Sequence, residues 1–316
     1  MQQYIMRRIL LMIPTMLFMT IVTFGLLRIP DGDFIMAQME EARGIDPEQI
    51  ERLRHELGLD APAPIQYFRW MGNILTGDLG DSFWQQKPVT QVIARAAPIS
   101  IELGILAIVI GLLISIPVGV GSAVFQNTPV DHIGRGVAII GISIPNFFLA
   151  ILVIIYGANW FGWFPPMTYQ SFWEHPWGNI QQFLPGAFVL GTSISAQNMR
   201  MIRTTMLETQ REDYVRTARA KGLNERSVIF KHAFRNALIP VVTLLGFQIA
   251  GTIGGSVIVE TVFSINGVGR TYIDAVRQRD YPLVQGILLM LISATLISNL
   301  LVDVSYSWLD PRIRYS

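Results

Sequence analysis

The sequence predicts an all-α membrane protein with six transmembrane helices and a small extracytoplasmic domain between the first two. Hydrophobic residues make up 51% of the 316 residues and charged residues 15%, whereas an ordinary soluble domain has about 25% charged residues. The mean hydropathy is +0.41. Stretches of about 20 mostly apolar residues, long enough to cross the hydrocarbon core as helices, recur along the chain. These observations favour a bilayer over the alternative of buried core helices in a large soluble protein.

Six apolar stretches define the expected membrane spans. They cover residues 9–29, 99–124, 136–158, 183–199, 238–259 and 283–304. The first is longer than the apolar region of a signal peptide, which has about 7 to 15 residues, and no A-x-A site follows it, so we expect it to remain as an anchor. Pro117 and Pro145 lie inside the second and third spans and predict bends that line a path.

The fourth span is the least hydrophobic of the six. It contains Thr192, Ser193, Ser195, Gln197 and Asn198. Without this span, the loop after Trp160, which has no Lys or Arg, would join the most basic segment directly, and the basic C-terminal residues would lie outside. We therefore keep it and expect its polar side chains to face other helices or a water-filled path.

Lysine and arginine predict the orientation, because they gather in the short cytoplasmic loops of membrane proteins. Fourteen of them lie on one side of the predicted membrane, in residues 7–8, at 135, in 200–235 and in 312–314. The opposite loops, residues 160–182 and 260–282, contain only Arg270, Arg277 and Arg279. Both termini are therefore expected in the cytoplasm.

The segment between the first two spans is much longer than a connecting turn and predicts a small outside domain. Residues 31–95 contain 11 acidic and 6 basic residues. Within them, Pro47–Leu57 predicts an amphipathic helix that either packs on a loop or acts as a docking surface or lid. The expected organisation is an N-terminal transmembrane helix (1–30), an extracytoplasmic loop domain (31–97), a transmembrane domain (98–305) with a cytoplasmic loop (200–237), and a cytoplasmic tail (306–316).

The cytoplasmic segment 200–235 predicts two short helices around Gly222. Basic residues suit the end of the first helix and Gly222 its left-handed cap, while Asn224 caps the second. In the second helix, Phe230 and Phe234 are spaced to meet on one face. Such a basic hairpin either lies on anionic lipid or inserts into a groove of a cytoplasmic partner.

Two runs in this segment, Tyr214–Gly222 and His232–Pro240, closely resemble the EAA coupling loop of ABC-importer permeases. The chain looks like a member of the dipeptide/oligopeptide subfamily. Three further stretches carry the same resemblance: Leu57–Asp60, Gly77–Gly80 and Leu309–Tyr315. Two places depart from the family pattern, since Arg216-Thr217-Ala218 replaces Glu-Ala-Ala and Pro30–Phe34 differs from Pro-Gly-Asp-Pro. A role for an acid at the first place is therefore not carried over.

The resemblance implies a type I importer fold in the cell (inner) membrane of a bacterium or archaeon. It implies that the chain pairs with a homologous second permease, that two ABC ATPase subunits bind its coupling loops from the cytoplasm, and that an extracytoplasmic substrate-binding protein delivers cargo. ATP and Mg would be bound by the ATPases, and the ATPase-coupling residues of this chain would be Arg216, Thr217, Ala218, Ala220, Lys221, Gly222, Leu223 and His232.

The chain itself is expected to have no catalytic, cofactor or metal site. It contains no G-x-x-x-x-G-K-[ST] phosphate-binding motif, no cysteine and four scattered histidines. A net charge of +1 gives no reason to expect nucleic acid as a partner. Membrane lipid is expected as a further partner, beside the protein subunits.

Polar and small residues inside the spans suggest a translocation path and a packing site. Asn198, Gln248 and Asn299 are path candidates, although hydrogen bonds between helices would explain them equally well. Gly251 and Gly255 form a G-x-x-x-G pair that allows close helix packing.

Three alternatives remain beside a peptide importer. A proton-coupled secondary transporter would need ionisable groups deep in the spans, but Glu102 and Asp303 lie near span ends. An intramembrane enzyme lacks support, since neither H-E-x-x-H nor G-x-S-x-G occurs. A permease of the same family could instead carry nickel complexes or sugars.

Overall fold

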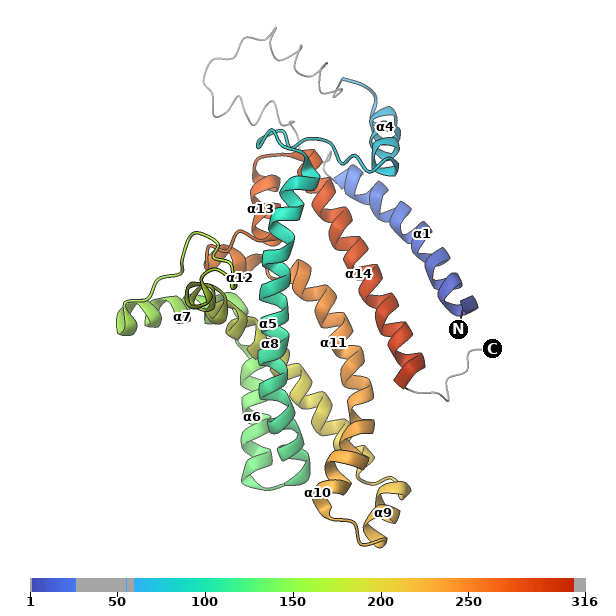
Figure 1. Ribbon diagram of the computed structural model, residues 1–316, viewed down its shortest axis with the longest axis vertical. Helices are drawn as coiled ribbons and strands as arrows, with labels where there is room; N and C mark the ends of the chain where they lie inside the picture. The colour runs from blue at the N-terminus through green and yellow to red at the C-terminus, as the bar shows by residue number, and fades with distance from the viewer. Residues whose placement is uncertain (1, 27–54, 56–59, 310–316) are drawn as a thin grey trace.

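The computed structural model describes residues 2–26, 55 and 60–309, and within these residues the chain is helical (Figure 1). Its helices are α1 (Gln2–Leu26), α4 (Ala63–Leu75), α5 (Val89–Val124), α6 (Pro129–Ser143), α7 (Asn146–Phe161), α8 (Pro176–Thr209), α9 (Asp213–Ala220), α10 (Glu225–Ser227), a π-helical segment (Val228–Phe234), α11 (Arg235–Gly255), α12 (Val257–Val262), α13 (Val268–Arg277) and α14 (Tyr281–Leu309). The α9–α10 region lies at one end of the molecule, and α4 and α13 lie at the other (Figure 1).

Several predictions concern segments that the structure does not describe. The amphipathic helix expected at 47–57 lies outside the described residues, as do residues 30–34, 57–59 and 310–315. Helix α4 is the described part of the outer segment, and it packs against α1, where the Tyr67 and Phe24 ring centroids lie 5.3 Å apart. Helix α5 begins at Val89 and so runs through the predicted domain boundary at residue 97.

The expected count of six spans is not confirmed. By length and composition, the described residues contain four helices able to cross a membrane, within α1, α5, the α10–α11 stretch and α14, or five if the bent pair α6–α7 is one span. Helix α8 is not among them because its polar residues lower its hydropathy. With 34 residues it is about 50 Å long, which exceeds the hydrocarbon thickness, so its place as a span stays a prediction.

The third expected span, 136–158, is not one straight helix. Helices α6 and α7 meet at an angle of 96° across a break at Ile144 and Pro145. Proline lacks the amide hydrogen that the helix needs and pushes the preceding residue into the extended region, where Ile144 lies with φ −81° and ψ 118°. The bend predicted at Pro145 is therefore confirmed, whereas α5 continues unbroken through Pro117.

The centre of the fold is the close packing of α5 on α8. A Cβ atom built on Gly111 would come within 2.6 Å of Ile194, and one on Gly119 within 2.9 Å of Ile202. A Cβ on Gly191 would lie 2.9 Å from the carbonyl oxygen of Ala107. Only glycine lets the two backbones approach so closely. The contact moves from Gly111 to Gly119 on α5 as it moves from Ile194 to Ile202 on α8, so the two helices run parallel.

The G-x-x-x-G pair predicted in the fifth span does not form this contact. A Cβ on Gly251 would meet no heavy atom within 4 Å, so Gly251 packs against no other described helix. The surroundings of Gly255 lie outside the described residues. Helix α11 instead approaches α14 at Gly246, which lies against Val302.

Candidate functional site

The predicted hairpin around Gly222 is present and continuous with two long helices. Helix α8 leads into α9, and the chain then turns at Lys221 and Gly222. Gly222 has φ +76°, the left-handed conformation that glycine adopts without strain. The amide nitrogen of Arg226 donates to Asn224 Oδ1 over 3.1 Å, which confirms Asn224 as the cap of the next helix.

The second arm of the hairpin is not the α-helix that the sequence predicts. After one turn of α10, residues 228–234 form a π-helix that continues into α11. The predicted contact of Phe230 with Phe234 is confirmed, because their ring centroids lie 6.2 Å apart. The spacing of apolar residues could not distinguish the π-helix from an α-helix. Side chains four residues apart lie close together in an α-helix and still meet when the turn is widened by one residue.

A small apolar core and two polar contacts hold the hairpin arms together. Val215, Ala218 and Val228 form a buried cluster between the arms. Arg219 Nη2 lies 2.8 Å from Glu225 Oε1 across the turn, and Asn236 Nδ2 donates to the Tyr214 hydroxyl over 2.8 Å. The hairpin therefore forms one packed unit attached to both α8 and α11.

Most of the predicted ATPase-coupling residues lie exposed on this unit. The exposed ones are Arg216, Thr217, Ala220, Lys221, Gly222 and Leu223. His232 is half-buried, and its backbone carbonyl accepts a hydrogen bond from Asn236. Ala218 differs from the prediction, because it is buried against the opposite arm and stabilises the hairpin instead of facing outward.

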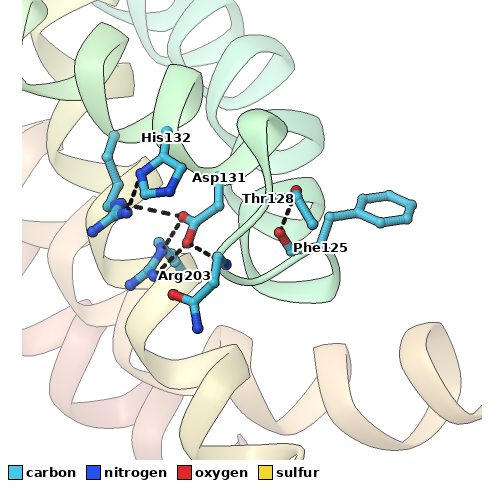
Figure 2. Close-up of polar contacts among 7 residues, drawn as sticks. Phe125, Thr128, Asp131, His132 and Arg203 are labelled. Carbon is cyan, nitrogen blue, oxygen red and sulfur yellow. Dashed lines mark hydrogen bonds and ion pairs between the residues drawn. The ribbon is translucent and has the colours of Figure 1, made fainter.

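A buried ion pair joins the base of the hairpin to the neighbouring helix α6 (Figure 2). Arg203 of α8 donates through Nε to Asp131 Oδ1 over 2.7 Å and through Nη2 to Oδ2 over 2.9 Å. The backbone nitrogen of Asn127 also donates to Oδ2, over 3.0 Å, and Arg135 Nε lies 3.5 Å from Oδ1. Asp131 is fully buried. The sequence analysis missed this pair, although Asp131, in the first turn of α6, is the only acid between the predicted spans 99–124 and 136–158.

Two of the three path candidates come together inside the helical bundle. Asn198 Nδ2 donates to Gln248 Oε1 over 3.2 Å, and the buried Asn198 Oδ1 has no hydrogen-bond partner in the described part of the chain. Asn299 lies elsewhere, in a groove between α1 and α14 beside the ion pair of Arg8 with Asp303. The structure thus brings Asn198 and Gln248 together and separates Asn299 from them.

Two buried carboxylates organise the opposite end of the molecule, and the sequence analysis missed both. Glu260 Oε1 accepts from the Ser100 hydroxyl over 2.6 Å and from the Ser256 hydroxyl, while Oε2 accepts from the Arg270 amide over 3.0 Å. Ser100 Oγ in turn accepts from the backbone nitrogen of Val268 at the start of α13, over 2.8 Å. These bonds tie α12 and α13 to α5.

Asp280 performs the same task for the loop before α5. Its carboxylate accepts from the Ser82 hydroxyl and from the amides of Phe83 and Trp84, the last two over 3.2 and 3.3 Å. It also accepts from the Leu283 amide in the first turn of α14, over 3.3 Å. Both carboxylates hold segments 160 to 198 residues apart in sequence.

Polar residues also gather around Glu102 on the same side. Asn179 Nδ2 donates to Glu102 Oε1 over 2.7 Å, and the Tyr169 hydroxyl donates to Oε2 over 3.3 Å. Burial, followed by the charge of Glu102, raises the pKa of Tyr169 above its usual range. Among the described residues, no three His, Asp or Glu side chains converge as metal ligands would.

Sequence comparisons with known proteins cover nearly the whole chain. Residues 115–315 match the family described as "Binding-protein-dependent transport system inner membrane component", and residues 1–104 match the N-terminal family of the same components. A Brucella abortus (strain 2308) protein named as a peptide transport system permease is 40% identical over 98% of both chains. The dipeptide transport system permease protein DppB of Escherichia coli (strain K12) is 38% identical over 100% of this chain and 99% of its own.

Among solved structures, an amino acid ABC transporter is similar to this chain with a TM-score of 0.49 and 18% sequence identity. That match covers 71% of this chain and 95% of the other.

Proposed function

The chain belongs to the family of binding-protein-dependent transport system inner membrane components, and from this premise we propose that it is a permease subunit of an ATP-driven peptide importer. Peptides are favoured over nickel complexes or sugars because full-length relatives at 36 to 40% identity are named as peptide or dipeptide permeases. The cargo is therefore a dipeptide or oligopeptide.

The hairpin around Gly222 carries this proposal. It is packed, its tip is exposed, and it joins α8 to α11 without an intervening flexible loop. Such a unit inserts into a groove of a cytoplasmic ATPase and moves with it as a rigid body. Closure of the ATPases on ATP then displaces α8 and α11 together and switches the path between outward-open and inward-open states.

The other subunits of the transporter are separate chains. This chain forms half of the translocation path with a homologous second permease, and two ATPase subunits bind ATP and Mg below the membrane. A substrate-binding protein delivers peptides from outside. We expect this chain not to hydrolyse ATP alone, since its sequence has no phosphate-binding loop. Both of its termini lie in the cytoplasm, as the distribution of Lys and Arg predicts.

Cysteine crosslinking tests the coupling. The chain has no cysteine, so Ala220→Cys and Leu223→Cys each introduce a single reactive group at the exposed hairpin. Both variants should crosslink to a co-expressed ATPase in the assembled transporter, whereas Asp60→Cys at the opposite end should not. Lack of any hairpin crosslink in a complex that transports peptide would refute the coupling, and labelling of these positions from outside intact cells would reverse the topology.

A further inference from the structure

A cavity of about 390 Å³ opens at the end of the molecule opposite the hairpin. Its walls are the N-terminal third of α5, the loop before α5, and α13, which lies beside α5 at this end (Figure 1). Asn266 just before α13, Leu283 of α14 and Tyr169 from the loop between α7 and α8 complete the lining. The volume lies within the range of about 300 to 1,000 Å³ that is usual for small-molecule sites.

Charges of both signs surround this cavity without neutralising one another. Lys87 lies in the loop before α5, Arg95 lies in α5, and Asp274 lies in α13. In the described part of the chain, no carboxylate lies within the 4.0 Å ion-pair distance of Lys87 or Arg95. Asp274 has one weak pair, with Arg270 at 4.0 Å, and both of these side chains reach solvent. The cavity therefore offers separate positive and negative partners to a molecule inside it.

The rest of the lining suits a short peptide. The side-chain amides of Gln91 and Asn266 line the cavity and make no hydrogen bond to other described residues, so they are free to bind peptide groups. Val92, Ala96 and Leu283 are buried and form an apolar floor. Such a floor accepts side chains of different shapes, because apolar contact is not directional.

The buried carboxylates Asp280 and Glu260 fix the walls of the cavity. Asp280 holds the loop that carries Lys87 through Ser82 and the neighbouring amides. Glu260 and Ser100 hold the first turn of α13, and thereby the helix that carries Asp274, against α5. A site that is fixed before its ligand arrives loses less entropy on binding.

We propose that this cavity binds the free peptide at the outer mouth of the permease, with the peptide carboxylate at Lys87 and Arg95 and the peptide ammonium at Asp274. This inference rests on the proposed function, because it names the place where the imported peptide first contacts this chain. A zwitterion offers a partner to both the basic and the acidic side chains of the cavity. A purely acidic segment of the binding protein would face Asp274 with like charge, and a purely basic segment would face Lys87 and Arg95 with like charge. The site would therefore bind the free ammonium and carboxylate ends of a peptide and accept different peptide side chains.

Equilibrium binding of radiolabelled alanyl-alanine tests the proposal. The complete transporter, reconstituted in nanodiscs without its binding protein, should bind this dipeptide saturably. Arg95→Gln and Asp274→Asn should each weaken binding about tenfold, because a hydrogen bond to a charged group is lost. Arg277→Gln, an exposed arginine of α13 that does not line the cavity, should leave the affinity unchanged.

Blocked dipeptides assign each end. Alanyl-alanine amide lacks the carboxylate and should bind wild type and Arg95→Gln equally, whereas N-acetyl-alanyl-alanine should bind wild type and Asp274→Asn equally. Absence of saturable binding, or equal alanyl-alanine affinity in wild type and both variants, would overturn the proposal. So would variants that lose capture of the purified binding protein while keeping dipeptide affinity, since the cavity would then be a protein-docking surface.

ATP-driven uptake of alanyl-alanine with the binding protein present separates this inference from the proposed function. Normal uptake by wild type without any dipeptide binding by the isolated transporter would refute the cavity alone. Absence of ATP-driven uptake of every peptide tested would refute the peptide importer itself.

Discussion

Replacing Arg203 by methionine removes the main partner of a buried carboxylate. Asp131 has no exposed side-chain surface, and Arg203 supplies two of its contacts, at 2.7 and 2.9 Å. After the change, Asp131 keeps the Asn127 amide and the more distant Arg135. Breaking a buried pair in this way costs about 3 to 5 kcal/mol, and the remaining partners favour the lower end of that range.

The reverse change should cost less. In Asp131→Asn, the side chain can still accept from the Asn127 amide, and Arg203 keeps 21% of its side chain exposed to solvent. We expect a loss of about 1.5 to 3 kcal/mol, typical of one charge-assisted hydrogen bond. The double variant should be less destabilised than the sum of the two single variants, because they share one interaction.

Denaturant titration of the assembled complex measures these differences. Arg135→Gln is the matched control, since this arginine faces the same carboxylate at 3.5 Å but is 43% exposed, so its loss should cost at most about 1 kcal/mol. The interpretation is wrong if Arg203→Met and Arg135→Gln are equally stable, or if the single effects add without coupling.

Three further predictions concern glycines and a buried acid. Gly222→Ala should destabilise the hairpin by about 1 kcal/mol, because φ is +76° there, and hydrogen exchange of the hairpin amides in the complex should report it. Gly191→Ala should lower thermal stability by about 1 to 3 kcal/mol, since its Cβ would lie 2.9 Å from a carbonyl oxygen, whereas Gly121→Ala on α5, with open space around it, should be neutral or stabilising. Asp280→Asn should loosen the loop that follows Asp81, which limited proteolysis from outside would detect as faster cleavage.

Features set by neighbouring residues could be predicted from the sequence. Gly222 and Asn224 determine their own turn and cap, and Pro145 breaks its own helix, so each was expected at the correct place. The bend inside the span over 136–158 was expected at Pro145, but its angle of 96° was not, because hydropathy averaged over a window carries no information on the angle between two helices. The π-helix was missed for a similar reason, since its apolar spacing is shared with an α-helix.

Contacts between distant segments could not be predicted in this way. Asp131 and Arg203 are 72 residues apart, Ser100 and Glu260 160, and Ser82 and Asp280 198. Nothing in the spacing of such residues identifies their partners, because register between helices depends on packing across the whole bundle. The close contacts between α5 and α8 also join distant segments. They are made by Gly111, Gly119 and Gly191, whereas Gly251 was predicted for helix packing.

Helix α8 links the two ends of the molecule that carry the proposed functions. Its C-terminal end leads into the hairpin, and Arg203 and the glycine contacts join it to α6 and α5. At its other end Asn179 bonds Glu102 of α5, two turns beyond Arg95 of the cavity. Because close-packed helices with interlocked side chains shift as a unit, a displacement of the hairpin should move α5 with α8. Helix α13 is hydrogen-bonded to Ser100 of α5 at its first turn, and Ala275 further along α13 packs in one apolar cluster with Val92 and Ala96 of α5, so we expect the cavity walls to move together with α5.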